Sequence, residues 1–318
     1  MSYVPIQFQQ RLSMVGLFDG YGSEDKSAKT LLMARWPHGF ECPGCGGREH
    51  CLLVARGLYQ CCRCHRQTSL EAGTIFHDSH LSFGGWSLAM HLLSQDKHSL
   101  SDLELKRQVG ICYNAAWALM DKLLQAVLER ESGRVLSGRV EVHDAYVGGG
   151  PHEGKRGRGT VGTPLLIAVV QTTKEETPSQ AKVVYRKVSA LADFKSRSIL
   201  EWAQRGLGKD NTVLTPGMAA FWAIGAVTKG HDAMVMDQCW PGSTRPMFKW
   251  ANTILGNLMG NIVGVIHWVS GKQQTWYLCE FQWRFNRLFE LSTQFDRLLR
   301  ATGITPAMPQ NRRLAEST

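Results

Sequence analysis

Two closely spaced pairs of cysteines are the first residues in this sequence whose types and spacing could do chemistry. Cys42 and Cys45 form one CxxC pair, and Cys61 and Cys64 form a second pair after fifteen intervening residues. Each pair places two thiolates on one side of a tight turn, and two such turns complete a tetrahedral zinc site. A redox-active CxxC would leave the second pair unexplained. Four neighbouring side chains could each replace one ligand: His50, Cys51, Cys62 and His65. The spacing therefore predicts structural Zn²⁺ on the two CxxC pairs.

A pattern with the proportions of a helix-turn-helix follows the cysteines. Residues 100–108 read as one helix, Gly110 supplies the turn, and a second helix with a buried apolar stripe begins near Tyr113. In DNA-binding proteins the second helix of this motif enters the major groove. On that interpretation four residues contact DNA: Lys106, Arg107, Tyr113 and Asn114. The alternative is two core helices joined by a glycine turn.

A glycine-rich basic segment at residues 148–159 carries Lys155, Arg156 and Arg158. It lacks the GxxxxGKS/T spacing of a phosphate-binding loop. One interpretation is contact with DNA phosphates, which depends on salt and carries little sequence information. The other is a solvated hairpin tip between two strands.

Composition and charge narrow the class of protein. The chain has 318 residues, of which 43% are hydrophobic and 20% charged, and this balance excludes a disordered chain. The net charge of +9 favours a polyanionic partner such as nucleic acid. Residues 1–135 hold 14 basic and 13 acidic residues (+1), whereas 136–318 hold 22 and 14 (+8). Without a signal-peptide pattern or a run of about 18 apolar residues, we expect a cytoplasmic protein with no membrane partner.

The order of segments predicts an α/β fold. Three segments rich in β-branched residues follow residue 134 and read as strands. After them we expect a helix near 193–205, a strand at 212–215, a helix near 218–227, an irregular loop at 229–249 and one long helix near 274–299. This order indicates a layered fold with a mixed sheet. We divide the chain into a helical segment at 1–37, a zinc ribbon at 38–80, a helix-turn-helix-like module at 81–134, an α/β domain at 135–302 and a disordered tail at 303–318.

The combined pattern resembles the transposases of small bacterial insertion sequences, which carry an N-terminal zinc ribbon before a DDE domain. The matching pieces are CPGCG, YQCCRCHRQTSLEAGTIF, LSDLELKRQVGICYNAAW, VEVHDAYVGG, FKWANTILGN and YLCEFQWRFNR, between about residues 25 and 295. The resemblance implies a ribonuclease H-like core and double-stranded terminal-repeat DNA as partner. It also implies strand cleavage and transfer with two Mg²⁺ or Mn²⁺ ions, and suggests a homodimer on paired ends.

The sequence departs from that family at three site positions. His143 stands where the family has its first catalytic Asp, Pro216 where it has the Asp of Ser-Asp-Gly, and Met259 where it has the Lys of Gly-Asn-Leu-Lys. The candidate catalytic residues that remain are Asp144, Asn257 and Glu280. Asp144 could replace His143 only after a shift of register, because one step along a strand turns a side chain to the opposite face.

Two functional hypotheses follow from these departures. The first is a DNA-binding transposase of this family whose strand cleavage and transfer are impaired. The second is a catalytically inactive relative that acts as a DNA-binding repressor or a domesticated architectural protein. A third hypothesis is a zinc-stapled module that binds RNA or protein. It holds only if the α/β domain does not have the fold that the resemblance implies.

Overall fold

The computed structural model describes residues 10–95, 99–147, 163–171, 183–234, 248–261, 271–288 and 290–307. The chain divides into two compact units. One comprises Met1–Glu129 with Arg287–Thr318, and the other comprises Arg130–Asn286. The finer division of the sequence into five parts stays a prediction.

The first unit contains helices that begin at side-chain caps. Its helices are α1 (Met14–Tyr21), α2 (Glu24–Arg35), α3 (Phe83–Gln95), α4 (Asp102–Val109), most of α5 (Tyr113–Ser132) and α9 (Leu291–Ile304). Ser13 and Ser23 each accept a backbone N–H at the start of α1 and α2. The Glu24 carboxylate accepts the backbone N–H groups of Phe83 and Gly84, at 3.0 and 3.4 Å. A carboxylate at the positive end of a helix is favourable, so α2 fixes the start of α3.

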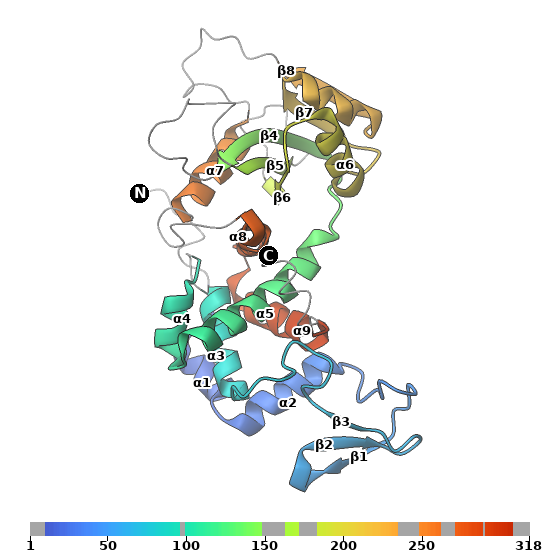
Figure 1. Ribbon diagram of the computed structural model, residues 1–318, viewed down its shortest axis with the longest axis vertical. Coiled ribbons are helices and arrows are strands. Elements are labelled where there is room, and N and C mark those ends of the chain that lie inside the picture. The colour runs from blue at the N-terminus through green and yellow to red at the C-terminus, as the bar shows by residue number, and fades with distance from the viewer. Residues whose placement is uncertain are drawn as a thin grey trace. The chain divides into compact units, whose positions relative to one another are not determined.

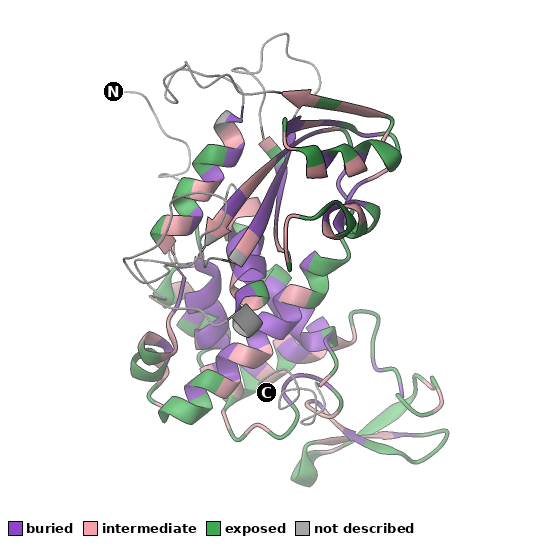
Figure 2. Cartoon of the chain, turned by 45° about the horizontal axis from the view of Figure 1, so that its top comes forward, coloured by how far each residue is buried: buried purple, intermediate pink, exposed green. Residues whose placement is uncertain are grey.

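A small antiparallel sheet belongs to the same unit. It consists of β1 (His50–Leu53), β2 (Leu58–Cys61) and β3 (Gln67–Ser69), in that order, with the 3-10 turn η2 (Val54–Arg56) between the first two. Gly57 closes the connection at φ 61°, a left-handed conformation that glycine adopts without strain. The side chains of this sheet are mainly exposed or half-buried, whereas β5 and much of β4 and β6 in the larger sheet are buried (Figure 2).

The second unit is built on a five-stranded mixed sheet (Figure 1). The strands are β4 (Arg139–Val147), β5 (Thr163–Gln171), β6 (Val183–Ala190), β7 (Thr212–Pro216) and β8 (Gly230–Met234). Their order is β6-β5-β4-β7-β8; β4, β5 and β6 pair antiparallel, and β7 is parallel to both β4 and β8. This topology is a mixed α/β layer and is consistent with a ribonuclease H-like DDE fold, so the predicted fold class is confirmed at that level.

Two apolar cores cover opposite faces of this sheet, because side chains alternate along each strand. The helical elements are α6 (Ser196–Gly206), the 3-10 helix η3 (Ala219–Ala226), α7 (Lys249–Asn261) and α8 (Gly271–Asn286). Val140 and Val142 of β4 pack with α6 and η3 on one face. Ala145 packs with α7 and α8 on the other. Any residue of β4 can therefore be assigned to a face by its position relative to these three.

The structure corrects four details of the predicted elements. The single helix expected near 274–299 is two helices, because α8 ends at Asn286 and α9 begins at Leu291. The helix expected near 218–227 is the 3-10 helix η3, and the loop expected at 229–249 contains the strand β8. The expected disordered tail at 303–318 starts too early, since Thr305 is buried and Pro306 forms a bridge with Thr74; residues 308–318 lie outside the described residues.

Among the helices of the described ranges, none is both long and apolar enough to cross a membrane.

Candidate functional site

The four predicted cysteines come together on two knuckles with matching backbone geometry. In the first knuckle the Gly46 N–H donates to the Cys42 carbonyl at 2.9 Å, and in the second the His65 N–H donates to the Cys61 carbonyl at 3.0 Å. Both donors have left-handed backbones, with φ 69° at Gly46 and 58° at His65. His65 is thus the turn residue of its knuckle.

The sulfur positions fit a tetrahedral zinc ion. The ligand atoms of Cys42, Cys45, Cys61 and Cys64 all lie within 4.8 Å of one another. The Cys42–Cys64 and Cys45–Cys61 sulfur pairs are 3.5 and 3.6 Å apart, close to the edge of about 3.8 Å expected for Zn–S bonds of about 2.3 Å. The backbone N–H of Gly44 is the main reason that the pKa of Cys42 falls to about 6, which favours the thiolate that binds metal. Four protein ligands make the zinc structural.

An aromatic cluster supports the knuckles. The ring of Phe40 lies 4.9 Å from Trp36 and 5.9 Å from Tyr59 between ring centroids, and Phe40 is buried with Cys42 and Cys61. His50 packs into this cluster, 4.7 Å from the Phe40 ring. Sequence spacing left His50 open as a substitute ligand, and the structure places it in aromatic packing.

The helix-turn-helix pattern forms as α4 and the start of α5. Gly110 ends α4 at φ 76°, and Leu105 and Ala116 are fully buried between the helices of the first unit. All four predicted DNA contacts are exposed, on α4 and on the first turn of α5: Lys106, Arg107, Tyr113 and Asn114. Trp117, one helical turn after Tyr113, is also exposed, at 39%. Its exposure was not apparent from the sequence, where tryptophan is usually read as core.

The predicted basic loop contacts lie outside the described residues; these are Lys155, Arg156 and Arg158.

The two degenerate family positions lie side by side in the larger sheet. The parallel ladder pairs Glu141 of β4 with Leu214 of β7. Two residues further along, His143 in the middle of β4 and Pro216 at the end of β7 therefore lie on the same face of neighbouring strands. This is the face that packs against α7 and α8. Glu141, two residues before His143 on the same face, accepts the Ala251 N–H of α7. The His143 Nδ1 donates to the Asp144 carbonyl at 2.6 Å, and its ring meets Phe248 edge-on at 5.3 Å.

The remaining candidate catalytic residues lie on three different elements and form no convergent cluster of ligand atoms among the described residues. Asp144 shares the opposite face of β4 with Val142 and Tyr146, whose ring contacts Phe194 at 5.2 Å. Asn257 is exposed on α7 and its amide donates to the Thr253 carbonyl. Glu280 is 1% exposed and is paired with Arg284 of the same helix. Met259, at the third degenerate position, packs partly against the α7 core.

Buried polar groups that sequence reasoning missed hold the second unit together. Glu141 is 2% exposed, and its Oε1 accepts the Ala251 N–H at 3.2 Å in the first turn of α7. The Glu131 carboxylate accepts hydrogen bonds from the Tyr185 hydroxyl and from the Gln282 amide. The sequence did hold one signal for Glu141, because a charged residue inside an apolar strand indicates a buried polar contact. No sequence signal links Glu131 to its partners.

A carboxylate cluster of the two-metal type is not found in the described part of the chain. There the four cysteines form the single group of three or more His, Cys, Asp or Glu side chains whose ligand atoms converge. A hydrogen-bonded pair does lie near the end of β7, where the Thr215 hydroxyl and the His231 Nε2 are 2.8 Å apart.

Each of the two units contains a segment that matches a known protein family. An ISXO2-like transposase domain matches residues 135–286, and a transposase zinc-ribbon domain matches residues 22–67. No curated protein matches the chain. Transposase domains imply DNA transposition and the binding of DNA. With the Cys₄ cluster in the ribbon and the mixed sheet in the matched domain, the chain belongs to the ISXO2-like transposases that carry an N-terminal zinc ribbon and a DDE domain.

Proposed function

We propose that this chain binds the double-stranded terminal repeats of an insertion sequence and that its strand cleavage and transfer are impaired. The observation that carries the proposal is the pairing of β4 with β7. It supports a family-type site on one face of these two strands, where His143 and Pro216 occupy the places of two carboxylates. DNA binding and the loss of cleavage are separate parts of the proposal.

The side chains of His143 and Pro216 do not fit a pair of Mg²⁺ or Mn²⁺ ions. These hard cations take oxygen ligands, usually carboxylates. His143 offers nitrogen, and its Nδ1 is already bonded to the Asp144 carbonyl; Pro216 offers no side-chain ligand. Glu280 is buried in its ion pair with Arg284. A divalent ion therefore binds here as a cofactor only if residues other than His143, Pro216 and Glu280 supply its ligands.

DNA binding rests on the exposed face of α4 and α5. Lys106, Arg107, Tyr113 and Asn114 face solvent there, which suits contacts to phosphates and base edges. Arg107 also lies 3.8 Å from Glu104, and an exposed pair of this kind is weak enough to be exchanged for a phosphate. The basic residues at 155–158 would add sequence-independent affinity. We place the protein in the bacterial cytoplasm at the nucleoid, with a homodimer bridging paired ends.

A cleavage and retention assay tests both parts. The purified chain is incubated with DNA that flanks its own coding region, with Mg²⁺ or Mn²⁺, and new 3′-ends are mapped. We expect DNA retention that weakens steeply with salt, and no nicked ends. Robust nicking that Asp144→Ala abolishes would show an active site and overturn the impairment.

The same geometry favours a second role, a DNA-binding repressor or domesticated architectural protein. In that case the chain occupies the terminal repeats without cutting them. Lys106→Gln with Arg107→Gln should weaken retention by about tenfold or more, whereas Lys195→Gln, at an 82% exposed side chain of the second unit, should not. Failure of the full chain to retain DNA at low salt would overturn both roles.

A further inference from the structure

A pocket in the first unit lies between α5 and the segment that leads from the zinc ribbon to α3. Its volume is about 490 Å³, within the range of about 300–1,000 Å³ typical of small-ligand sites. Apolar side chains form most of its wall, among them Ile75, Leu81, Trp86, Ala115, Ala118 and Leu119. A planar apolar group the size of a nucleobase therefore matches the interior.

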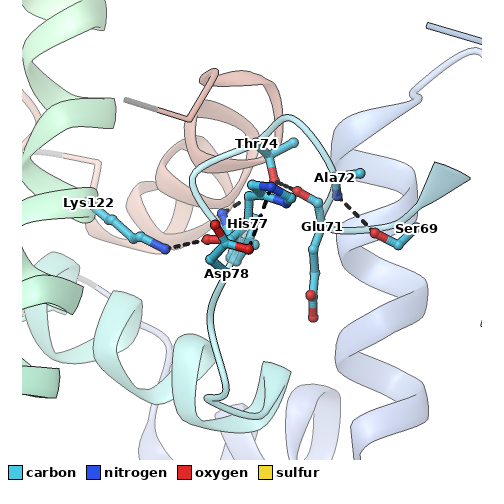
Figure 3. A network of polar contacts seen from close by, with 8 residues as sticks. Ser69, Glu71, Ala72, Thr74, His77, Asp78 and Lys122 are labelled. Atoms are coloured by element: carbon cyan, nitrogen blue, oxygen red, sulfur yellow. Dashed lines mark hydrogen bonds and ion pairs between the residues drawn. The ribbon is translucent and has the colours of Figure 1, made fainter. Parts of the chain in front are cut away.

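Nitrogen donors stand at the rim of this pocket. The Lys122 ammonium donates to the His77 carbonyl at 2.7 Å and lies 5.9 Å from the centroid of the Trp86 ring. Figure 3 shows Lys122 reaching from its helix to the loop that carries His77 and Asp78. The His80 side chain lines the same rim. An ammonium and two imidazoles suit a phosphate group.

An acceptor complements these donors. The Asp78 carboxylate lies 3.6 Å from the His77 Nε2 and is 76% exposed. It can accept a hydrogen bond from an exocyclic amino group, which adenine, guanine and cytosine carry. The pocket thus offers an apolar interior, one ammonium, two imidazoles and one acceptor, which together match a nucleotide better than they match an inorganic anion.

The pocket opens beside the proposed DNA-binding face of α5. Ala118 lies on its wall, and Asn114, one helical turn earlier, is exposed on that face. Residues four apart are neighbours on a helix surface. A DNA strand that contacts Tyr113 and Asn114 therefore passes close to the lining of the pocket.

We infer that this pocket takes one unstacked nucleotide of the DNA that α5 contacts, with the base in the apolar interior and its phosphate at Lys122, His77 and His80. The inference rests on the proposed DNA-binding function. Removing a base from the stack costs free energy, least for a mismatched or unpaired base. The chain should therefore prefer DNA with such a base at the contacted position.

Mononucleotide binding tests the pocket without requiring duplex binding. The zinc-loaded full chain is titrated with deoxyadenosine 5′-monophosphate, deoxyadenosine and inorganic phosphate, and binding is followed by ligand-observed NMR. We expect the nucleotide to bind at least about tenfold more tightly than phosphate alone. Ala118→Leu fills the pocket and Lys122→Gln removes the ammonium, and each should weaken the nucleotide by about tenfold. Ala226→Leu and Lys195→Gln, at exposed positions of the second unit, are the matched controls.

Several results would overturn the inference. These are that the full chain fails to bind the nucleotide, that it binds phosphate as tightly as the nucleotide, or that Lys122→Gln binds the nucleotide as tightly as wild type. The Lys122→Gln variant keeps the test valid if Ala118→Leu misfolds. Duplexes with and without one mismatch then separate the two proposals. Wild type should favour the mismatched duplex, and Lys122→Gln should lose that preference while still retaining the paired one. If the chain retains neither duplex at low salt, the DNA-binding function fails whatever the mononucleotide does.

Discussion

Asn286 pairs with the backbone of Arg186 through both ends of its side-chain amide. The Arg186 N–H donates to its Oδ1 and its Nδ2 donates to the Arg186 carbonyl, both at 2.9 Å. The Gln282 Oε1, one turn earlier on α8, accepts the Val188 N–H at 3.0 Å. Because β6 is the outer strand of the sheet, these amides occupy backbone groups that another strand would otherwise pair with. Helix α8 thereby closes that edge of the sheet.

Asn286→Ala should loosen this edge. The change leaves a backbone donor and acceptor of Arg186 without their partner, which costs about 1–3 kcal/mol per buried group. Hydrogen exchange over residues 183–190 should accelerate by about tenfold or more. Asn257→Ala is the control, because the Asn257 amide is exposed and donates to the Thr253 carbonyl of its own helix. Unchanged exchange in Asn286→Ala would show that α8 does not hold β6.

Glu141→Ala should destabilise the second unit at the start of α7. The substitution removes the carboxylate that accepts the Ala251 N–H and leaves a cavity, at a cost of about 1–3 kcal/mol measured by urea unfolding. Glu141→Gln keeps an acceptor oxygen and should lose less. Equal losses in the two variants would mean that the hydrogen bond to α7 contributes little.

Zinc should be required for the ribbon alone. Cys42→Ala removes one of four ligands, so bound zinc should fall from about one equivalent to near none, and the ribbon should become sensitive to protease. Cys51→Ala removes a neighbouring exposed cysteine outside the cluster and should retain the metal. Zinc loss in Cys51→Ala instead would change the ligand assignment.

The stability of the second unit should fall in alkali through Cys279. Burial, with a smaller effect of the Glu131 charge, raises the pKa of this thiol to about 12, whereas an unfolded thiol ionises near 8.5. The folded state therefore keeps a proton that the unfolded state loses. The stabilisation is complete below about pH 8.5 and is lost towards pH 12, with a limiting slope of about 1.4 kcal/mol per pH unit.

Cys279→Ala should flatten that part of the stability curve. The exposed Cys112 offers the matched substitution, Cys112→Ala, which should leave the slope as in wild type. Identical curves for the two variants above pH 9 would remove Cys279 as the cause.

Two substitutions should rebuild a metal site. His143→Asp together with Pro216→Asp places carboxylates on one face of two neighbouring strands. Mn²⁺ should then bind at least about tenfold more tightly than to wild type in a titration followed by electron paramagnetic resonance. Adding Asp144→Asn should change little, because Asp144 lies on the other face of β4. Tight Mn²⁺ binding by wild type that Asp144→Asn abolishes would contradict this arrangement.

Short-range patterns predicted the parts of the structure that depend on local spacing. The paired CxxC turns and the turn at Gly110 were readable because each needs particular residues at fixed intervals. The strand β8 was not readable, because Gly230–Met234 has no β-branched residue and is a strand only through its pairing with β7. The 3-10 form of η3 was equally hidden, since its apolar sequence suits any buried helix.

Long-range contacts explain the remaining differences. The break between α8 and α9 follows Asn286, whose side chain bonds the backbone of a strand one hundred residues away in the sequence. The buried partners of Glu131 lie 54 and 151 residues from it. For the candidate site, strand alternation was enough to separate Asp144 from His143. Only the β4–β7 register brings His143 next to Pro216.

The β4–β7 ladder also has a consequence for how the gene can evolve. The β4–β7 pairs end at Glu141 and Leu214, two residues before His143 and Pro216, so mutations at codons 143 and 216 can remove two ligands and leave these backbone pairs in place. Under the proposed function, such a loss of ligands can be reversed without rebuilding the sheet. The gene then encodes a folded intermediate to which activity can return through changes at these codons.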